Sequence, residues 1–193
     1  EQAGFRSVYA ADLNKTACKT YETNFHHPVF CGDIADLERL PERPELIVGG
    51  PPCQGFSPLG KMSASEVMQQ NHISMNKLWQ HYFRLVEDSM PRAFIVENVP
   101  QLLTSKEYPL IVKKAEELGY NVVSGVLKAE MYGVPQKRTR GFIIGALDFY
   151  PALPGPTKER KTVRDAIGDL PPKPTGENLH IGRNPTPKSL ERY

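Results

Sequence analysis

Cys53 is the side chain of this sequence best placed to act as a nucleophile. It follows the apolar run 46–48, and Pro51 and Pro52 stand directly before it. The two prolines fix the backbone φ angle and Gly55 permits a turn behind the thiol, so the loop is stiff enough to aim the cysteine. Open α/β sheets hold their chemistry beyond the carboxyl ends of their strands. The pattern therefore predicts an attacking thiol at a strand end, although an isolated cysteine is more often a small buried side chain.

Three carboxylates follow apolar runs in the same way: Asp12, Asp33 and Glu97. If those runs are parallel strands, these carboxylates and Cys53 converge on one crevice from four segments of the chain. From the residues alone, Asp12 and Asp33 fit a helix cap as well as they fit a ligand contact. Glu97 also fits a cap of the turn after it, but its expected place beside the Cys53 strand favours a functional role.

A basic cluster comes later in the chain, at Lys137, Arg138 and Arg140 beside Gln136. Such a cluster is usually a solvated face, but here it is expected in a loop between two strands on the crevice side. Guanidinium groups bind phosphate oxygens through paired hydrogen bonds, which favours a functional role. The net charge of +2 permits a nucleic-acid partner without establishing one.

The elements that must position these groups alternate between strand and helix patterns. Asn14 or Asp12 can cap the first helix, and Gly119 can end the last one in a left-handed conformation. Apolar strands separated by helices indicate an α/β fold, with a mostly parallel sheet and helices on both faces. Helices are expected within 17–25, 78–90 and 111–118, and strands at 7–11, 29–31, 46–48, 93–96, 122–127 and 142–147.

Length and composition set the remaining limits. The 193 residues fit one globular domain, in which 1–150 hold the expected strands and 151–193 form a Pro-rich extension with one short helix at 163–170. No stretch has the roughly 20 apolar residues of a membrane span, and no signal-peptide pattern is present, so a cytosolic protein is expected. The cysteines and histidines lack paired or ligand spacing, so neither a disulfide framework nor a metal site is expected.

Three ordered signatures resemble the DNA (cytosine-5)-methyltransferases of bacterial or phage type, over nearly the whole chain. They are Gly-Pro-Pro-Cys-Gln-Gly-Phe-Ser around Cys53, Glu97-Asn98-Val99, and Gln136-Lys137-Arg138-Thr139-Arg140, with Asp12 and Gly32-Asp33-Ile34 upstream. The resemblance implies a Rossmann-like methyltransferase fold that uses S-adenosylmethionine and releases S-adenosylhomocysteine. It also implies double-stranded DNA as the partner and the bacterial cytoplasm as the location.

The resemblance assigns catalytic roles to four residues. Cys53 would add to carbon 6 of a cytosine, which activates carbon 5 for methyl transfer. Glu97, protonated in a dry pocket, would contact ring nitrogen 3 and the exocyclic amine, because burial raises the pKa of a carboxyl group. Arg140, and less directly Arg138, would hold the target base and a backbone phosphate near the thiol.

The resemblance also implies binding roles. The segment 61–74, expected to be a mobile loop beside the thiol, would close over the DNA. Asp12 would accept hydrogen bonds from the ribose hydroxyls of the cofactor, and Asp33 and Ile34 would bracket its adenine. The full set expected at the cofactor is Asp12, Leu13, Asp33, Ile34 and Pro51, and the set expected at the DNA or target base is Gln54, Ser57, Asn98 and Gln136.

Compared with this family, the chain is expected to be incomplete at both ends. The family's first strand and glycine-rich cofactor loop would precede Glu1, and its target-recognition region and last motifs would follow residues 184–193. We therefore expect a monomer, or a protein completed by a second chain, and reduced activity for this chain alone.

Two alternatives remain open. An RNA cytosine-5 methyltransferase would use the same thiol and glutamate, but its branch tends to have Pro-Phe-Thr where this chain has Gly55-Phe56-Ser57. A catalytically inactive, DNA-binding or regulatory relative usually loses the thiol or the glutamate. Both are retained here, so the residues favour an active DNA methyltransferase.

Overall fold

The computed structural model describes residues 3–51, 78–177, 180–182 and 186–191. They belong to two compact units. The first unit consists of Glu1–Lys128 and Arg138–Pro156, and the second of Ala129–Lys137 and Thr157–Tyr193. The strands all lie in the first unit, which therefore contains the sheet edges on which the expected site depends.

The first unit begins with a two-stranded parallel sheet, in which β1 (Ala10–Asp12) pairs with β2 (Val29–Cys31). The crossover between them is α1 (Lys15–Asn24). Asn14 caps α1, since its side-chain oxygen accepts two first-turn backbone N–H groups at 2.8 and 3.1 Å. The structure thus selects Asn14 over Asp12 as the cap.

Two longer helices follow, α4 (Leu78–Ser89) and α5 (Glu107–Glu117). A left-handed residue follows each: Met90 after α4, with φ 46°, and Gly119 after α5, with φ 88°. The end expected at Gly119 is therefore confirmed. Among the described residues, no helix has the length and apolar composition needed to cross a membrane.

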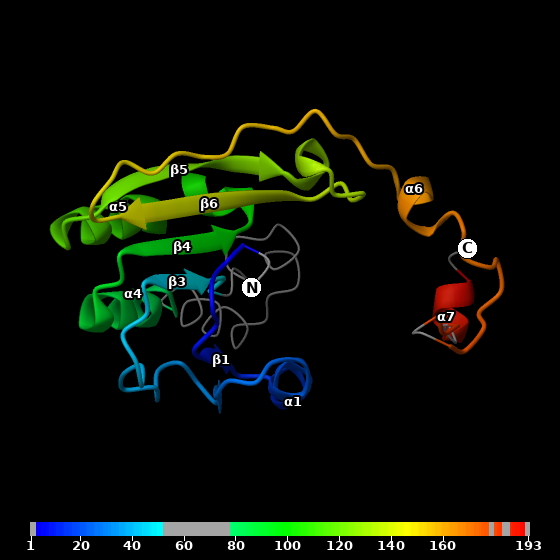
Figure 1. Ribbon diagram of the computed structural model, residues 1–193, viewed down its shortest axis with the longest axis horizontal. Helices are drawn as coiled ribbons and strands as arrows, with labels where there is room; N and C mark the ends of the chain where they lie inside the picture. Colours follow the sequence, from blue (N-terminus) through cyan, green and yellow to red (C-terminus); the bar gives the residue numbers. More distant parts are fainter. Residues whose placement is uncertain (1–2, 52–77, 178–179, 183–185, 192–193) are drawn as a thin grey trace. The chain divides into compact units, whose positions relative to one another are not determined.

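A four-stranded sheet forms the centre of the first unit, in the order β3-β4-β6-β5 (Figure 1). β3 pairs with β4 in parallel, whereas β6 pairs with both β4 and β5 in antiparallel register. The 3-10 helix η1 (Pro100–Thr104) follows β4. The strands are β3 (Leu46–Gly49), β4 (Ala93–Asn98), β5 (Asn121–Lys128) and β6 (Thr139–Ala146).

The α/β fold class is confirmed, but the expectation of a mostly parallel sheet holds only for the pairs β1–β2 and β3–β4. The segment between β5 and β6 contains only the short 3-10 helix η2 (Ala129–Tyr132). A parallel return needs a crossover of about a dozen residues or more, usually a helix, so β6 returns antiparallel. It also begins earlier than expected, and Arg140 lies in the strand rather than in the preceding loop.

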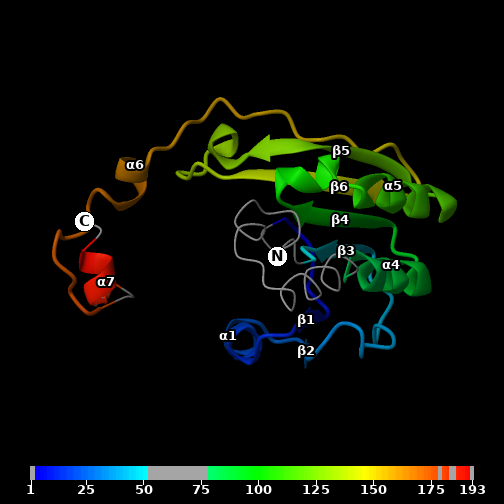
Figure 2. The same ribbon diagram turned by 180° about the vertical axis from the view of Figure 1, so that it is seen from behind.

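The core of the first unit lies between the four-stranded sheet and two helices that contact one another, α4 and α5 (Figure 2). Helices on both faces were expected, and in the described part of the chain these two share one face. Phe94 is fully buried, and its ring packs edge-on against Phe83 of α4 at 5.2 Å and Tyr120 at 5.0 Å between centroids. Alternation along β4 puts Phe94, Val96 and Asn98 on the buried face, so Glu97 projects from the other.

The second unit contains η2, α6 (Val163–Ile167) and α7 (Pro187–Leu190). A capping box starts α6: Asp165 N–H donates to the Thr162 hydroxyl, and the Asp165 carboxylate accepts from the Thr162 N–H at 2.7 Å. The Thr162 N–H and hydroxyl both donate to the Asp165 carboxylate, which lowers the pKa of Asp165. The short helix expected at 163–170 is thus present, although it ends three residues earlier.

Candidate functional site at the carboxyl ends of β3 and β4

Four expected features lie outside the described residues: Cys53, Gln54, Ser57 and the segment 61–74. What the structure locates is the end of β3, the strand that precedes them in the sequence. β3 ends at Gly49, directly opposite Val96 of β4 in parallel register. Glu97 is the next residue of β4, so it lies at the sheet edge where the Cys53 loop begins.

The Glu97 carboxylate lies against this loop. A Cβ atom added to Gly50 would meet Glu97 Oε2 at 3.4 Å and the Glu97 carbonyl oxygen at 3.5 Å. Gly50 is three residues before Cys53. The residue expected to be the acid thus lies against a backbone position three residues before the expected nucleophile.

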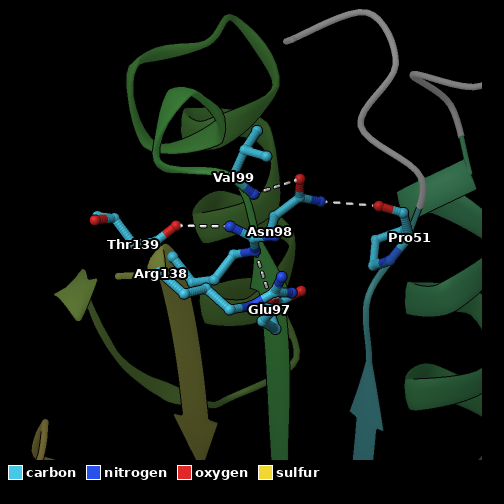
Figure 3. Close-up of polar contacts among 7 residues, drawn as sticks. Pro51, Glu97, Asn98, Val99, Arg138 and Thr139 are labelled. Atoms are coloured by element: carbon cyan, nitrogen blue, oxygen red, sulfur yellow. Dashed lines mark hydrogen bonds and ion pairs between the residues drawn. The ribbon is translucent and has the colours of Figure 1, made fainter. Parts of the chain in front are cut away.

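Two guanidinium groups hold the Glu97 carboxylate. Arg138 Nη2 lies 3.3 Å from Glu97 Oε1 (Figure 3). Arg140 Nε lies 2.8 Å from the same oxygen. The Glu97 side chain is 33% exposed. The carboxylate is therefore partly solvated and paired with two cations, whereas a dry pocket was expected.

Asn98 is directed to the opposite face from Glu97 and is 5% exposed. Its amide nitrogen donates to the Pro51 carbonyl at 2.8 Å, and its amide oxygen accepts the Val99 N–H at 2.9 Å (Figure 3). Both ends of the amide are thus paired, as a buried polar group requires. The bond to Pro51 ties the end of β4 to the loop that leads to Cys53, a contact that the sequence pattern did not predict.

Tyr82 of α4 supports the same strand ends. Its hydroxyl shares a hydrogen between the carbonyls of Ile47 in β3 and Ile95 in β4, each at 3.1 Å. Burial raises the pKa of Tyr82, so the hydroxyl remains a donor. Its ring occupies the space that a side chain at Gly49 would need. From the sequence, Tyr82 was placed only within the helix expected at 78–90 and was given no role.

Apart from Pro51, which follows β3, the expected cofactor residues lie at the end of the smaller sheet. Asp12 is paired with Cys31, and its carbonyl accepts the Gly32 N–H at 3.1 Å, which brings Asp33 to the same edge. Each carboxylate also accepts one nearby backbone N–H: Asp12 from Asn14 at 2.7 Å and Asp33 from Ala35 at 2.9 Å. Both aspartates are exposed, so hydroxyl donors from solution can reach them.

Leu13, the next residue expected at the cofactor, is 70% exposed, and Ile34 is half-buried. Two exposed carboxylates beside accessible apolar side chains fit a nucleoside, which offers ribose hydroxyls and an apolar base.

Gln136, expected at the DNA, is exposed in the second unit, where its N–H donates to the Val134 carbonyl at 2.8 Å.

The arrangement has the fold of S-adenosylmethionine-dependent methyltransferases. A crystal structure of a prophage-encoded E. coli protein, described as a DNA modification methyltransferase, superposes with a TM-score of 0.66 at 30% identity. The match covers 89% of this chain and 50% of that protein.

The sequence profile of the C-5 cytosine-specific DNA methylases matches residues 1–191, and the chain belongs to this family. It is 37% identical to the type II methyltransferase M.MthTI of Methanothermobacter thermautotrophicus, over 93% of this chain and 57% of the relative. It is 34% identical to the type II methyltransferase M1.HphI of Haemophilus parahaemolyticus, over 100% of this chain and 55% of the relative. The chain thus spans about half the length of these curated relatives.

Proposed function

We propose that this chain provides the catalytic half of an enzyme that transfers a methyl group from S-adenosylmethionine to carbon 5 of cytosine in DNA. The observation that carries the proposal is the Glu97 carboxylate, held by Arg140 and Arg138 beside Gly50 at the start of the Cys53 loop. A nucleophile and an acid from adjacent strands suit an addition that generates charge on a ring.

In the proposed reaction, the Cys53 thiolate forms a bond to carbon 6 of the cytosine. The electron pair displaced from the ring moves toward nitrogen 3, where Glu97 supplies a proton or hydrogen bond. Carbon 5 then takes the methyl group, which the sulfonium of S-adenosylmethionine supplies when the cofactor is bound. Loss of the proton from carbon 5 and cleavage of the sulfur–carbon 6 bond release the product, because a thiolate is a good leaving group.

The two arginines have a second role in this proposal. Arg138 has a half-exposed side chain, so it can exchange its bond to Glu97 for one to a DNA phosphate. Arg140 is less exposed and lies closer to Glu97, which suits it to hold the carboxylate and the target base. A target base inside a duplex must first leave the base stack, at a cost of a few kcal/mol that such contacts offset.

The binding residues fall into two groups, one for the cofactor and one for the DNA. We assign Asp12 to the ribose of the cofactor, Asp33 and Ile34 to its adenine, and Pro51, with Leu13, to the remainder of the cofactor site. Gln54, Ser57 and Gln136 are assigned to the target base and DNA. Asn98 is assigned to the same site through the backbone at Pro51, because its own amide is buried and paired. The two exposed aspartates at one sheet edge support the first group, and the bond from Asn98 to Pro51 supports its place beside the loop.

For the organisation of the protein, we propose that 1–150 form part of the catalytic domain and that 151–193 lead toward a region that recognises the DNA sequence. The names of the relatives suggest a role as a type II methyltransferase. From the family, we propose that it acts on double-stranded DNA in the bacterial cytoplasm. A monomer is the simplest assembly, and a second chain is the alternative.

A covalent trap tests the proposal. The chain, and a version extended to the length of its curated relatives, are incubated with S-adenosylmethionine and duplex DNA that contains 5-fluorocytosine. Fluorine at carbon 5 prevents the final elimination, so a denaturant-resistant adduct accumulates. We expect the adduct to vanish in Cys53→Ala and to persist in Cys31→Ala, which removes an exposed thiol of the smaller sheet.

Each outcome has a separate meaning. An adduct with the extended version alone supports the mechanism and shows that adduct formation also needs residues outside this chain. An adduct with the chain itself shows that the chain is sufficient. Adducts only on single-stranded RNA that carries the same base would favour the RNA alternative, and no adduct on either nucleic acid would refute the proposed function.

A further inference from the structure

Arg84, on α4, makes an unusual set of bonds to the backbone after β2. Its Nη1 atom donates to the Glu38 carbonyl at 2.6 Å. Its Nη2 atom donates to the Leu37 carbonyl at 2.7 Å and to the Ile34 carbonyl at 3.1 Å. One guanidinium group therefore fixes three main-chain carbonyls within the segment 34–38.

This segment begins at the expected adenine contacts. It is a turn, in which the Asp36 N–H donates to the Asp33 carbonyl at 2.9 Å and the Leu37 N–H to the Ile34 carbonyl at 3.4 Å. The Leu37 side chain is buried, whereas Asp33 is exposed. The local bonds of the turn are few, so the three bonds from Arg84 supply much of what determines the course of its backbone.

The geometry requires an arginine. Five N–H donors in a planar fork can satisfy several carbonyls at once, whereas the ammonium group of a lysine is a point donor. Asp88, one turn further along α4, lies 3.8 Å from the Arg84 Nη1 atom, which is a weak, partly exposed contact. The carbonyls of 34–38, and not the ion pair, are thus the principal partners of the guanidinium.

Arg84 also joins two parts of the first unit that share no strand pairing. In the described part of the chain, the β1–β2 sheet and the four-stranded sheet are separate. α4 packs on the larger sheet through Phe83 and Val86, and Tyr82 bonds the ends of β3 and β4. The stretch that follows β2, drawn in blue to cyan, passes close to α4 in both views (Figures 1 and 2). The same helix therefore holds the catalytic strand ends and the turn after Asp33.

We propose that Arg84 is a positioning residue for the adenine side of the S-adenosylmethionine site, acting through the backbone of 34–38. The inference rests on the proposed function, because it takes Asp33 and Ile34 as cofactor contacts. Arg84 donates its hydrogen bonds to the protein backbone and contacts no reacting atom. Its removal should loosen the turn and weaken cofactor binding while the catalytic groups at Glu97 remain in place.

The test uses the protein extended to the length of its relatives and three variants. Arg84→Met keeps the aliphatic stem and removes all three bonds, Arg84→Lys keeps the charge, and Asp88→Asn removes only the ion pair. Arg92→Met is the matched control, since Arg92 pairs with Asp148 at an exposed site. Calorimetry gives the dissociation constant for S-adenosylmethionine, and hydrogen exchange follows the Asp36 and Leu37 amides.

For Arg84→Met, we expect the dissociation constant for S-adenosylmethionine to rise about tenfold and the two amides to exchange faster. The KM for the cofactor should rise, while kcat at saturating cofactor and the affinity for DNA change by less than about twofold. The dissociation constant of Arg84→Lys for S-adenosylmethionine should lie between those of Arg84→Met and the unaltered protein. If Arg84→Met does not fold, Arg84→Lys decides the test. Asp88→Asn and Arg92→Met should bind the cofactor normally.

The results separate this inference from the function on which it rests. If the unaltered protein does not bind S-adenosylmethionine, the proposed function fails and the inference fails with it. If the unaltered protein binds but both Arg84 variants bind equally well, Arg84 does not position the site. An equal loss of cofactor and DNA binding in the Arg84 variants would point to general destabilisation and would also overturn the inference.

Discussion

Glu97 and Asp12 both stand near the carboxyl end of a strand, but the sheets that carry them differ. β4, with Glu97, lies between β3 and β6, and its other face is buried beneath α4 and α5. β1, with Asp12, pairs in the described part of the chain only with β2, and the one buried residue of α1 is Cys18. The proposed catalytic side therefore stands on a packed core and the proposed cofactor side on a small exposed sheet.

The contacts around the two carboxylates differ in the same way. Glu97 is held by arginines more than forty positions away in the sequence, and Asn98 bonds a carbonyl 47 positions away. The carboxylates of Asp12 and Asp33 accept N–H groups from residues two positions further along the chain. Groups fixed by distant contacts depend on the whole core. On the cofactor side the carboxylates are held locally, and it is the backbone after Asp33 that has distant support, from Arg84 of α4. Substitutions on the two sides should therefore differ in both the kind and the size of their effects.

The largest expected effect is on catalysis. Glu97→Gln keeps the size of the side chain and removes its acid function, so the rate of methyl transfer should fall by roughly 10²–10⁴-fold. Binding of S-adenosylmethionine should change little, because Asp12, Leu13, Asp33 and Ile34 lie at the end of the other sheet and Pro51 is bonded to Asn98 rather than to Glu97. The measurement is single-turnover methylation of duplex DNA, with Glu117→Gln on α5 as a control for charge loss, since Glu117 is exposed and pairs only weakly with Lys113 at 3.7 Å. Undiminished transfer by Glu97→Gln would remove Glu97 from the mechanism.

The next effect concerns the two cores. Phe94→Ala should lower the free energy of unfolding by about 3–5 kcal/mol, because the ring is fully buried between Phe83 and Tyr120. Phe30→Ala in β2 should cost only about 1 kcal/mol, since that side chain is half-buried. Fluorescence of Trp79, the single tryptophan, follows unfolding by denaturant, because its ring packs against Phe83 at 6.1 Å. Equal costs for the two variants would mean that the small sheet is as well packed as the large one.

Local patterns predicted those parts of the fold that depend on local physics. The strand 29–31 is confirmed at its expected bounds, and Gly119 ends α5 with the positive φ that its lack of a side chain favours. The direction of β6 could not be predicted in this way, because an apolar run does not specify which strand lies beside it. Thr139 and Arg140 were assigned to a loop for a related reason, since polar residues begin the strand.

In the candidate site, too, the sequence predicted residue types and spacing better than contacts between distant residues. Glu97 and the arginines were identified from residue types and spacing, and the structure brings Glu97, Arg138 and Arg140 together. The alternation Phe94, Val96, Asn98 was available in the sequence and would have placed Asn98 on the buried face. The bonds made by Tyr82 and Arg84 join residues 13 to 50 positions apart, and no periodicity encodes such contacts.

A smaller effect is expected at Asn98. Asn98→Asp removes the donor to the Pro51 carbonyl and places a carboxylate beside it, so the free energy of unfolding should fall by about 1–3 kcal/mol. Asn24→Asp is the counterpart in α1, the helix between β1 and β2. There the side-chain amide of Asn24 donates to the Thr20 carbonyl at an exposed helix end. This substitution should cost about 0.3–1 kcal/mol, because a negative charge is unfavourable at a helix C-terminus. Denaturant titration of both variants checks the difference, and a smaller loss for Asn98→Asp than for Asn24→Asp would show that the Pro51 bond contributes little.

The last and most local effect is expected at the cap of α1. Asn14→Ala should lower the stability of the first unit by about 1 kcal/mol, because two first-turn N–H groups lose their acceptor. Asn14→Ser should restore most of this loss, since serine is a comparable cap. Thermal unfolding and exchange of the Thr16 and Ala17 amides measure the change. The cost should remain confined to the β1–β2 region, so exchange in β4 should be unaltered; faster exchange in β4 would show that the two sheets unfold as one cooperative unit despite their separate hydrogen bonding.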